Sequence, residues 1–330
     1  MPTGTCTNKD CAVSATGKCV LQGDPIGCPH YVLDAPLSTS GKPAAEDTAA
    51  DDRAPRVFHS GFELGTDDAS VLTQARYAHI FGILGFWDAG KTCLLSSLYL
   101  MASHGELRPW YRFAGSLTLQ GFEQRARRLR RWEDGNLPEQ LSEHTSLAHP
   151  RRPALLHLAL EELQGRQRHL ELLFTDLPGE WTRSLVERAD TAARFAFVGR
   201  ADGLILVADA NALAAKTTRS GELLRHSLLL ERLAETLRLP TSLPLLLAVA
   251  KSDGVAGELP EYAHRLAEHA RSLGLSCEIV QCAAFSSCPQ RIANGLGVVG
   301  LVRRIGEGLQ PLPDAKSDVR GLRSFQRFEK

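Results

Sequence analysis

Gly85-Phe-Trp-Asp-Ala-Gly-Lys-Thr92 is the most informative segment of this 330-residue chain. It fits the pattern G-x-x-x-x-G-K-[ST], with an apolar, strand-like run before it at residues 77–84 and a helical pattern after it at residues 91–103. A strand, a glycine-rich turn and a helix in this order can hold a phosphate, because the loop amides and the free N–H groups of the helix surround one anion. The stretch therefore predicts a nucleotide site.

The residue types within the loop suit that chemistry. Glycines at both ends permit the backbone turns that aim successive amides inward. Lys91 is expected to place a positive charge between the β- and γ-phosphates, and Thr92 to offer its hydroxyl to Mg²⁺. The predicted phosphate-binding residues of the loop are Gly85, Asp88, Ala89, Gly90, Lys91, Thr92 and Cys93.

Apolar runs alternate with helical patterns along the rest of the chain. The runs at residues 154–163 and 169–175 are so closely connected that they favour an antiparallel hairpin, since a parallel pair needs a longer crossover. Further strands are expected at residues 203–208, 243–250 and 277–283, and helices at 220–238, 261–273 and 298–308. This order predicts an α/β fold of the P-loop NTPase type, a mostly parallel sheet with one antiparallel edge strand and helices on both faces.

Composition divides the chain into parts. We expect a Cys-rich module at residues 1–32, a flexible Ala-, Pro-, Ser- and Asp-rich linker at 33–56, a nucleotide-binding domain at 57–309 and a poorly ordered tail at 310–330. An insertion at 104–152 is expected to hold an irregular loop and a basic amphipathic helix. The basic residues of that helix are Arg125, Arg127, Arg128, Arg130 and Arg131. Such a run is typical of a solvated helix face, and contact with phosphates or an acidic partner is the alternative.

Bulk charge and hydropathy exclude some classes of function. The chain is 43% hydrophobic and 23% charged, with a formal net charge of +0. Nothing in that balance draws the molecule to nucleic acid or to an anionic membrane. The sequence holds no apolar run of about 20 residues and no secretory-signal layout at its N-terminus, so we expect a cytoplasmic protein that does not span a membrane.

A second nucleotide element follows the hairpin, as Asp176-Leu-Pro-Gly179. An Asp that ends a buried strand can hold Mg²⁺ through water, and the Gly179 N–H can contact the γ-phosphate. Glu180 comes next, and it would either orient the attacking water or simply favour the first turn of a helix. A threonine that completes the Mg²⁺ and γ-phosphate contacts is expected before the hairpin, with Thr145 the best placed and Thr118 the alternative.

Lys251-Ser-Asp253 follows the strand at 243–250, and here the chain resembles the TRAFAC class of P-loop GTPases. The resemblance covers residues 77–308 and implies GTP and GDP as ligands. It implies that Asp253 accepts hydrogen bonds from guanine and that Lys251 covers the base, although Ala250 stands where Asn or Thr is usual. It also implies an amide at Ala283 that meets guanine O6, and a role for Asp88 in binding a monovalent cation or in stabilising the loop.

A narrower resemblance rests on residues 113–122, on Asp-Leu-Pro-Gly-Glu-Trp at 176–181 and on the N-terminal cysteines. These look like the bacterial double-GTPase group, in which two GTPase modules are thought to act together in multi-gene systems linked to defence. The resemblance implies a slow, Mg²⁺-dependent GTPase switch whose partner is a second GTPase or a regulatory protein. The alternatives are a scaffold that binds nucleotide without turnover and an ATP-using P-loop enzyme.

Four cysteines and a histidine crowd the first thirty residues. These residues are Cys6, Cys11, Cys19, Cys28 and His30. In a reducing compartment they favour a tetrahedral Zn²⁺ site over disulfides, with an iron–sulfur cluster or unliganded thiols as the alternatives. The remaining cysteines, at positions 93, 277, 282 and 288, are expected to be small core residues.

Overall fold

The structure is a computed structural model that describes residues 4–6, 30–33, 61–75, 77–129, 154–165, 167–237 and 242–309. The chain divides into two units, Met1–Val57 and Phe58–Lys330. In the first unit, β1 (Gly4–Cys6) pairs antiparallel with β2 (Tyr31–Leu33). The predicted tail and nearly all of the predicted linker lie outside the described residues.

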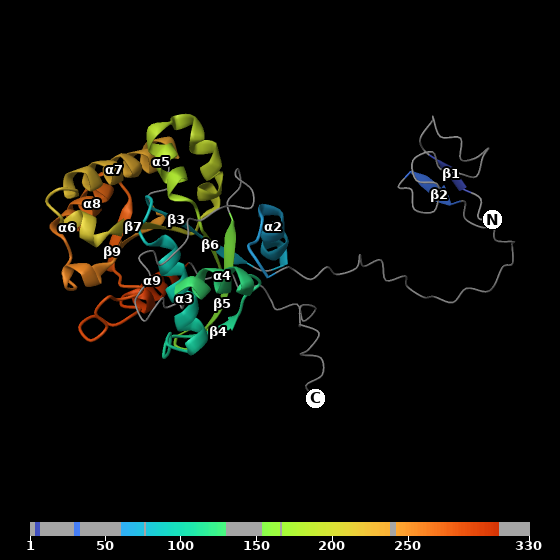
Figure 1. Cartoon of the computed structure of the whole chain (residues 1–330), viewed down its shortest axis with the longest axis horizontal. Helices are drawn as coiled ribbons and strands as arrows, with labels where there is room; N and C mark the ends of the chain where they lie inside the picture. The colour runs from blue at the N-terminus through green and yellow to red at the C-terminus, as the bar shows by residue number, and fades with distance from the viewer. Residues whose placement is uncertain are drawn as a thin grey trace. The chain divides into compact units, whose positions relative to one another are not determined.

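The second unit is built on a seven-stranded sheet with the strand order β4-β5-β6-β3-β7-β8-β9 (Figure 1). The strands are β3 (Ala78–Leu84), β4 (Tyr111–Gly115), β5 (Leu155–Glu162), β6 (His169–Thr175), β7 (Gly203–Asp209), β8 (Pro244–Ala250) and β9 (Ser276–Gln281). Strand β3 lies parallel to both β6 and β7, and the parallel order continues through β8 and β9. The mostly parallel sheet and the hairpin between β5 and β6 are as predicted.

One detail of the predicted topology is wrong. Strand β5 is the strand that runs against the others, but it pairs with β4 on one side and β6 on the other, so it does not lie at the edge. The edge belongs to β4, within the segment predicted as an inserted helix and loop. Only five residues form β4, which is too short for its period-2 pattern to stand out from the surrounding loop.

Helices cover both faces of the sheet. They are α2 (Thr66–Ala75), α3 (Lys91–His104), α4 (Leu119–Leu129), α5 (Gly179–Glu187), the 3₁₀ helix η2 (Ala189–Arg200), α6 (Ala210–Ala214), α7 (Arg219–Glu231), the π turn η3 (Arg232–Thr236), the 3₁₀ turn η4 (Ser252–Val255), α8 (Glu261–Ser272) and α9 (Val298–Gly308). Helices α3, α4 and α9 share one core with one face of the strands, while α5 to α8 share another.

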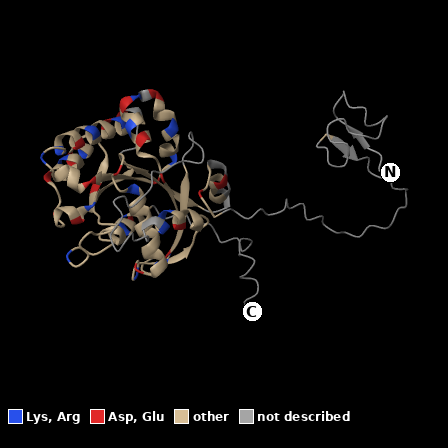
Figure 2. Cartoon of the chain, viewed as in Figure 1, with Lys and Arg blue, Asp and Glu red and all other residues tan. Residues whose placement is uncertain are grey.

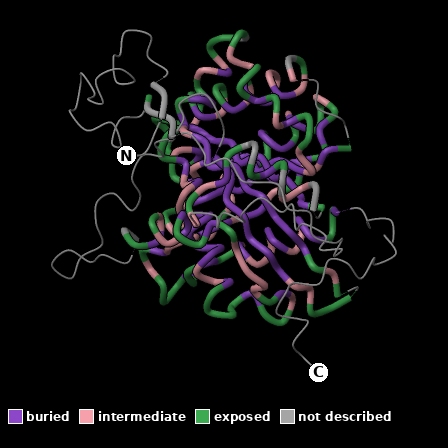
Figure 3. The backbone as a smooth tube through the Cα atoms, turned by 90° about the vertical axis from the view of Figure 1, so that its right-hand side faces the viewer, coloured by how far each residue is buried: buried purple, intermediate pink, exposed green. Residues whose placement is uncertain are grey.

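The strands supply both of these cores because their side chains alternate between faces. In β7, for example, Ile205 and Val207 belong to the first core, and Leu204 and Leu206 to the second. The buried residues are concentrated in the strands and the inner faces of the helices (Figure 3). Acidic and basic residues are interspersed over the helices in Figure 2, as a formal net charge of +0 allows.

This topology brings the predicted nucleotide elements to the same end of the sheet, where the carboxyl ends of the parallel strands lie. The phosphate loop follows β3, Asp176 follows β6 and Lys251 follows β8, and all three of these strands are parallel. Ligands of open parallel sheets bind beyond the carboxyl ends of the strands. Among the helices that the structure describes, none has the length and apolar character needed to cross a bilayer.

Candidate nucleotide-binding site

The phosphate loop turns sharply between β3 and α3. Gly90 has a φ of 98° directly before the helix, and Asp88 also lies in the left-handed region with a φ of 58°. A β-carbon at Gly85 would meet the Val207 carbonyl oxygen at 2.7 Å. The two glycines therefore serve different purposes, since Gly90 provides an unusual backbone angle and Gly85 allows close approach to the neighbouring strand β7.

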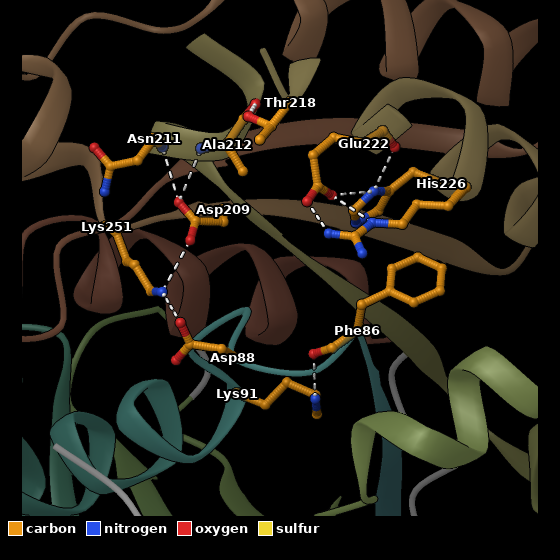
Figure 4. Close-up of polar contacts among 11 residues, drawn as sticks. Phe86, Asp88, Lys91, Asp209, Asn211, Ala212, Thr218, Glu222, His226 and Lys251 are labelled. Carbon is orange, nitrogen blue, oxygen red and sulfur yellow. Dashed lines mark hydrogen bonds and ion pairs between the residues drawn. The ribbon is translucent and has the colours of Figure 1, made fainter. Parts of the chain in front are cut away.

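Lys91 closes the loop from inside. Its Nζ donates to the Gly85 carbonyl at 2.8 Å. It also donates to the Phe86 carbonyl at 2.9 Å (Figure 4). Burial lowers the pKa of Lys91 to about 8, although the negative charges of Asp176, Glu180 and Asp88 act in the opposite direction. The ammonium group is therefore held within the loop, where it interacts with the carboxylate of Asp88 in the loop itself and with those of Asp176 and Glu180 in the second element.

The second element packs directly against the phosphate loop. A β-carbon at Gly179 would lie 2.5 Å from the backbone nitrogen of Trp87 and 2.8 Å from the carbonyl carbon of Phe86. Only a glycine allows this approach. Asp176 is buried just before it, and Glu180 is exposed in the first turn of α5. Because Glu180 lies close enough to affect Lys91 and also sits at a helix N-terminus, both predicted roles for this residue stay open.

The residues at this point have the right chemistry for Mg²⁺. Asp176 offers a carboxylate and Thr92 a hydroxyl, which are the hard oxygen donors that Mg²⁺ prefers. The structure adds a group that the sequence did not predict here. Arg125 of α4 is partly buried, and its Nε donates to the Asp176 Oδ2 at 2.7 Å. The solvated helix face is therefore the wrong interpretation for Arg125, although Arg127 is exposed as expected.

Lys251 links the predicted guanine element to the phosphate loop. Its Nζ lies 2.9 Å from Asp88 Oδ2 and 2.8 Å from Asp209 Oδ2 (Figure 4). Burial acts to lower the pKa of Lys251, but the hydrogen bonds to Asp209 and Asp88 outweigh it and raise the pKa. Lys251 itself has a φ of 57°, so the backbone turns directly after β8. Asp88 thus acts as an acceptor that joins the two loops.

Asp209 was missed by the sequence analysis. It ends β7, and its Oδ1 accepts hydrogen bonds from the backbone N–H groups of Asn211 and Ala212, which caps α6. Helix α6 in turn packs on the predicted guanine element, because a β-carbon at Gly254 would lie 2.0 Å from the Asn211 Oδ1. The signal that could have found Asp209 is the one that found Asp176, an Asp at the end of a buried strand.

The carboxylate of Asp253 is held by the loop that follows β9. Its Oδ2 accepts from the Ser287 backbone N–H at 2.9 Å and from the Ser287 hydroxyl at 2.8 Å. No local pattern marks Ser287, which is 34 residues away along the chain. Ala250 contacts the phosphate loop, since its β-carbon lies 3.4 Å from the position that a β-carbon at Gly90 would take.

The prediction for Ala283 disagrees with the structure. Ala283 is buried, its N–H donates to the Leu296 carbonyl at 3.0 Å, and its own carbonyl accepts from the Gly295 N–H at 2.9 Å. The amide that was expected to meet guanine O6 is therefore used in a bridge between two loop residues. The strand ends at Gln281, so the turn that follows it begins earlier than the sequence suggested.

The predicted switch threonines have different outcomes. Thr145 lies outside the described residues. Thr118 is buried, and its Oγ1 accepts the His157 N–H at 2.8 Å and lies 3.3 Å from the His157 carbonyl oxygen, to which it donates. These bonds tie the start of α4 to β5. The Thr118 hydroxyl therefore has a structural function in this conformation.

The candidate zinc ligands are described only in part. Cys6 lies opposite Tyr31 in the β1–β2 pair, and His30 directly precedes Tyr31 in the chain. Cys11, Cys19 and Cys28 lie outside the described residues, and within the described ones no group of three or more His, Cys, Asp or Glu is placed to hold a metal ion. Zinc therefore stays a prediction. Of the other cysteines, Cys277 and Cys282 are buried as expected, and those at positions 93 and 288 are half-buried.

The fold and site together define a P-loop nucleotide-binding protein. The sequence matches the model of the Double-GTPase 2 family over residues 79–305, which is more than half of its length. The chain belongs to this family, and so to the GTP-binding P-loop proteins. No curated protein matches the sequence.

Solved structures give more distant similarities. A signal recognition particle receptor complex, SRb-GTP/SRX from Chaetomium thermophilum, is 17% identical with a TM-score of 0.40, and the match covers 70% of this chain and 99% of that one. A GTP-binding protein from Sulfolobus solfataricus in complex with GDP is 15% identical with a TM-score of 0.32, covering 73% of this chain and 54% of that one. A mutation variant of SsGBP is also 15% identical, with a TM-score of 0.35 and coverage of 73% and 58%.

Proposed function

We propose that this protein binds GTP and GDP with Mg²⁺ and hydrolyses GTP slowly to GDP and phosphate, as a molecular switch. The observation that carries the proposal is the close packing of three nucleotide elements around Lys91. Gly179 leaves room for the phosphate loop, and Lys251 joins that loop through Asp88. Under this proposal the loop amides and Lys91 would hold the phosphates. Thr92 and Asp176 would hold Mg²⁺, which would supply positive charge beside the phosphates.

Guanine specificity would come from Asp253. An ionised carboxylate can accept hydrogen bonds from the N1–H and the 2-amino group of guanine, whereas adenine offers no such pair and would leave it unsatisfied. Ser287 supports this function, because its N–H and hydroxyl both donate to Oδ2 and hold the Asp253 carboxylate in place. The stem of Lys251 would cover the base. Ala283 has no part in this proposal, because its amide is used within the protein.

Hydrolysis would depend on an attacking water in line with the γ-phosphate. Glu180 is exposed at the start of α5, directly after Gly179, and can orient such a water through its carboxylate. Its negative charge beside the γ-phosphate favours a low intrinsic rate, since charge of the same sign builds up there. We propose that a second GTPase or a regulatory protein raises this rate, within a bacterial multi-component system with a role in defence, and the family name Double-GTPase 2 supports the first kind of partner.

Binding is tested first, by calorimetry with GTP, GDP and ATP in the presence of Mg²⁺. We expect GTP and GDP to bind and ATP to bind at least about tenfold more weakly. Lys91→Ala should abolish binding, and Asp253→Asn should remove the preference for guanine while leaving the phosphate loop intact. Equal affinity for ATP and GTP in the wild-type protein, unchanged in Asp253→Asn, would instead identify an ATP-using enzyme.

Turnover is tested next, by single-turnover GTP hydrolysis with wild type, Glu180→Gln and Glu180→Ala. The expected result is slow hydrolysis that changes in both variants. Binding without any turnover would favour a second candidate function, a scaffold that holds nucleotide for partner proteins. The exposed acid at Glu180, where a water-orienting glutamine is the common arrangement, is the observation behind this alternative.

Zinc binding by the N-terminal module is a separate part of the proposal. A segment this short has little core, so a metal held by Cys6, Cys11, Cys19, Cys28 and His30 would supply most of its stability. Metal analysis of the purified protein should find one zinc per chain, and Cys11→Ser should lower that content. A wild-type protein without zinc or iron would refute the metal site.

A further inference from the structure

Arg125 brings a second cation to the candidate Mg²⁺ carboxylate. It lies on α4, 51 residues before Asp176 in the chain, and its Nε donates to the Asp176 Oδ2 at 2.7 Å. The Asp176 side chain is 0% exposed and that of Arg125 is 11% exposed. A buried ion pair of this kind is held in place by its surroundings and does not exchange freely with solvent.

The rest of the guanidinium is also occupied. One Arg125 NH2 group pairs with the Glu63 Oε1, and the NH1 group donates to the Gly121 carbonyl at 2.9 Å. Arg125 therefore connects the end of β6, helix α4 and the segment before α2. Burial acts to lower the pKa of Arg125, but the charges of Asp176 and Glu63 outweigh it and raise the pKa, so the group is positively charged at any ordinary pH.

Two further observations place this pair close to the phosphate loop. Burial lowers the pKa of Lys91, and Asp176 lies close enough to that lysine for its negative charge to oppose this effect. Helix α4 packs on the same face of the sheet as α3, whose first turn carries Thr92. A bare Asp176 carboxylate would repel a nucleotide phosphate across this short distance, and a cation bound to the carboxylate removes that repulsion.

We propose that Arg125 is a positioning residue of the nucleotide site, which neutralises Asp176 when Mg²⁺ is absent and so lets the protein hold nucleotide without the metal. The inference rests on the proposed function and deepens it. Mg²⁺ and the guanidinium share one carboxylate, so the arginine reduces how strongly nucleotide affinity depends on Mg²⁺. Helix α4, which carries Arg125, thereby becomes part of the nucleotide site.

The test compares nucleotide affinity with and without Mg²⁺. The dissociation constant of a fluorescent GDP analogue is measured in excess Mg²⁺ and again in EDTA. The readout is the ratio of the dissociation constant in EDTA to that in Mg²⁺. Removal of the positive charge in Arg125→Gln should raise this ratio about tenfold or more, because the affinity in EDTA falls while the affinity in Mg²⁺ is retained. Arg125→Lys keeps the charge and should restore most of the wild-type ratio.

Glu63→Gln is the matched control. It removes the other acid that Arg125 contacts but leaves the contact with Asp176, so the ratio should stay within about twofold of the wild-type value. If Arg125 only stabilises the fold, Arg125→Gln should weaken binding by the same factor with and without Mg²⁺, and that result would overturn the proposal. An unchanged ratio in Arg125→Gln would overturn it as well.

Thermal melting accompanies each measurement. Should Arg125→Gln not fold, the double variant Glu63→Gln, Arg125→Gln removes one acid together with the base and undergoes the same test with the same expected rise in the ratio. The two levels of the proposal are distinguishable. A wild-type protein that binds no guanine nucleotide would refute the proposed function, whereas binding with equal ratios in wild type and Arg125→Gln would refute only the role of Arg125.

Discussion

Replacing Gly179 by alanine tests whether the second nucleotide element packs on the phosphate loop. The added β-carbon would lie 2.5 Å from the Trp87 nitrogen, 2.7 Å from the Trp87 Cα and 2.8 Å from the Phe86 carbonyl carbon, whereas ordinary contact begins at 3.4 Å. All three neighbours are backbone atoms, so no side chain can rotate away. Overpacking of this kind costs about 1–3 kcal/mol. The loop can relieve it only by leaving the shape that surrounds the phosphate, and GDP affinity should therefore fall by about 5- to 150-fold.

Gly221→Ala is the matched control. Gly221 is an exposed residue of α7 with nothing within 4 Å of its potential β-carbon, and its φ is not in the left-handed region. This variant should bind GDP like the wild type and should be more stable by up to about 1 kcal/mol, because alanine favours a helix. Calorimetry with GDP and Mg²⁺, together with urea unfolding, measures both effects. Wild-type affinity in Gly179→Ala, with Gly221→Ala behaving as expected, would refute the packing argument.

Three further predictions concern single side chains. Because burial lowers the pKa of Lys91 to about 8, the folded protein loses a proton between pH 8 and 10.5 that the unfolded chain keeps. The free energy of unfolding of nucleotide-free protein should therefore rise across this window by roughly 3 kcal/mol relative to that of Lys91→Met. If urea unfolding gave the same pH dependence of this free energy in both proteins, the lowered pKa would be contradicted. Asp88→Asn weakens an exposed contact with Lys251, so the free energy of unfolding should change by less than about 1 kcal/mol. GDP release, measured by fluorescence, should become about two- to fivefold faster. An unchanged release rate would show that this contact does not stabilise the nucleotide-bound state. Thr118→Val leaves the buried His157 N–H without its acceptor and should lower the free energy of unfolding in urea by about 1–3 kcal/mol. A loss of Mg²⁺-dependent GDP affinity without a loss of stability would instead make Thr118 a ligand of the nucleotide site.

The main elements of the fold could be predicted because their signals are local. The run before Gly85 and the helical pattern after it lie within about 25 residues, and each needs only a short period of apolar side chains to be recognised. The loop glycines, Lys91 and Asp176 were found in the same way. The residues next to them in the sequence form patterns that identify them. The structure places them at one end of a parallel sheet.

The position of β4 could not be predicted from such signals. Its five residues alternate too briefly to stand out, and whether the edge of the sheet is β5 or another strand depends on a pairing roughly 40 to 50 residues away. Ala283 failed for a related reason. A backbone amide can serve a ligand only if no other part of the chain uses it, and its partner Leu296 belongs to a loop with no regular pattern.

The class of the protein follows from local sequence, because the strand, loop and helix around Lys91 and the acids after two strands are encoded in consecutive residues. How those pieces are joined depends on the folded chain. The contacts of Asp176 with Arg125, of Lys251 with Asp88 and Asp209, and of Asp253 with Ser287 link residues from 34 to 163 positions apart. The order of strands in the sheet and the close approach of the loops beyond it determine which residues form these pairs. Neither produces a recognisable pattern in the sequence around those residues.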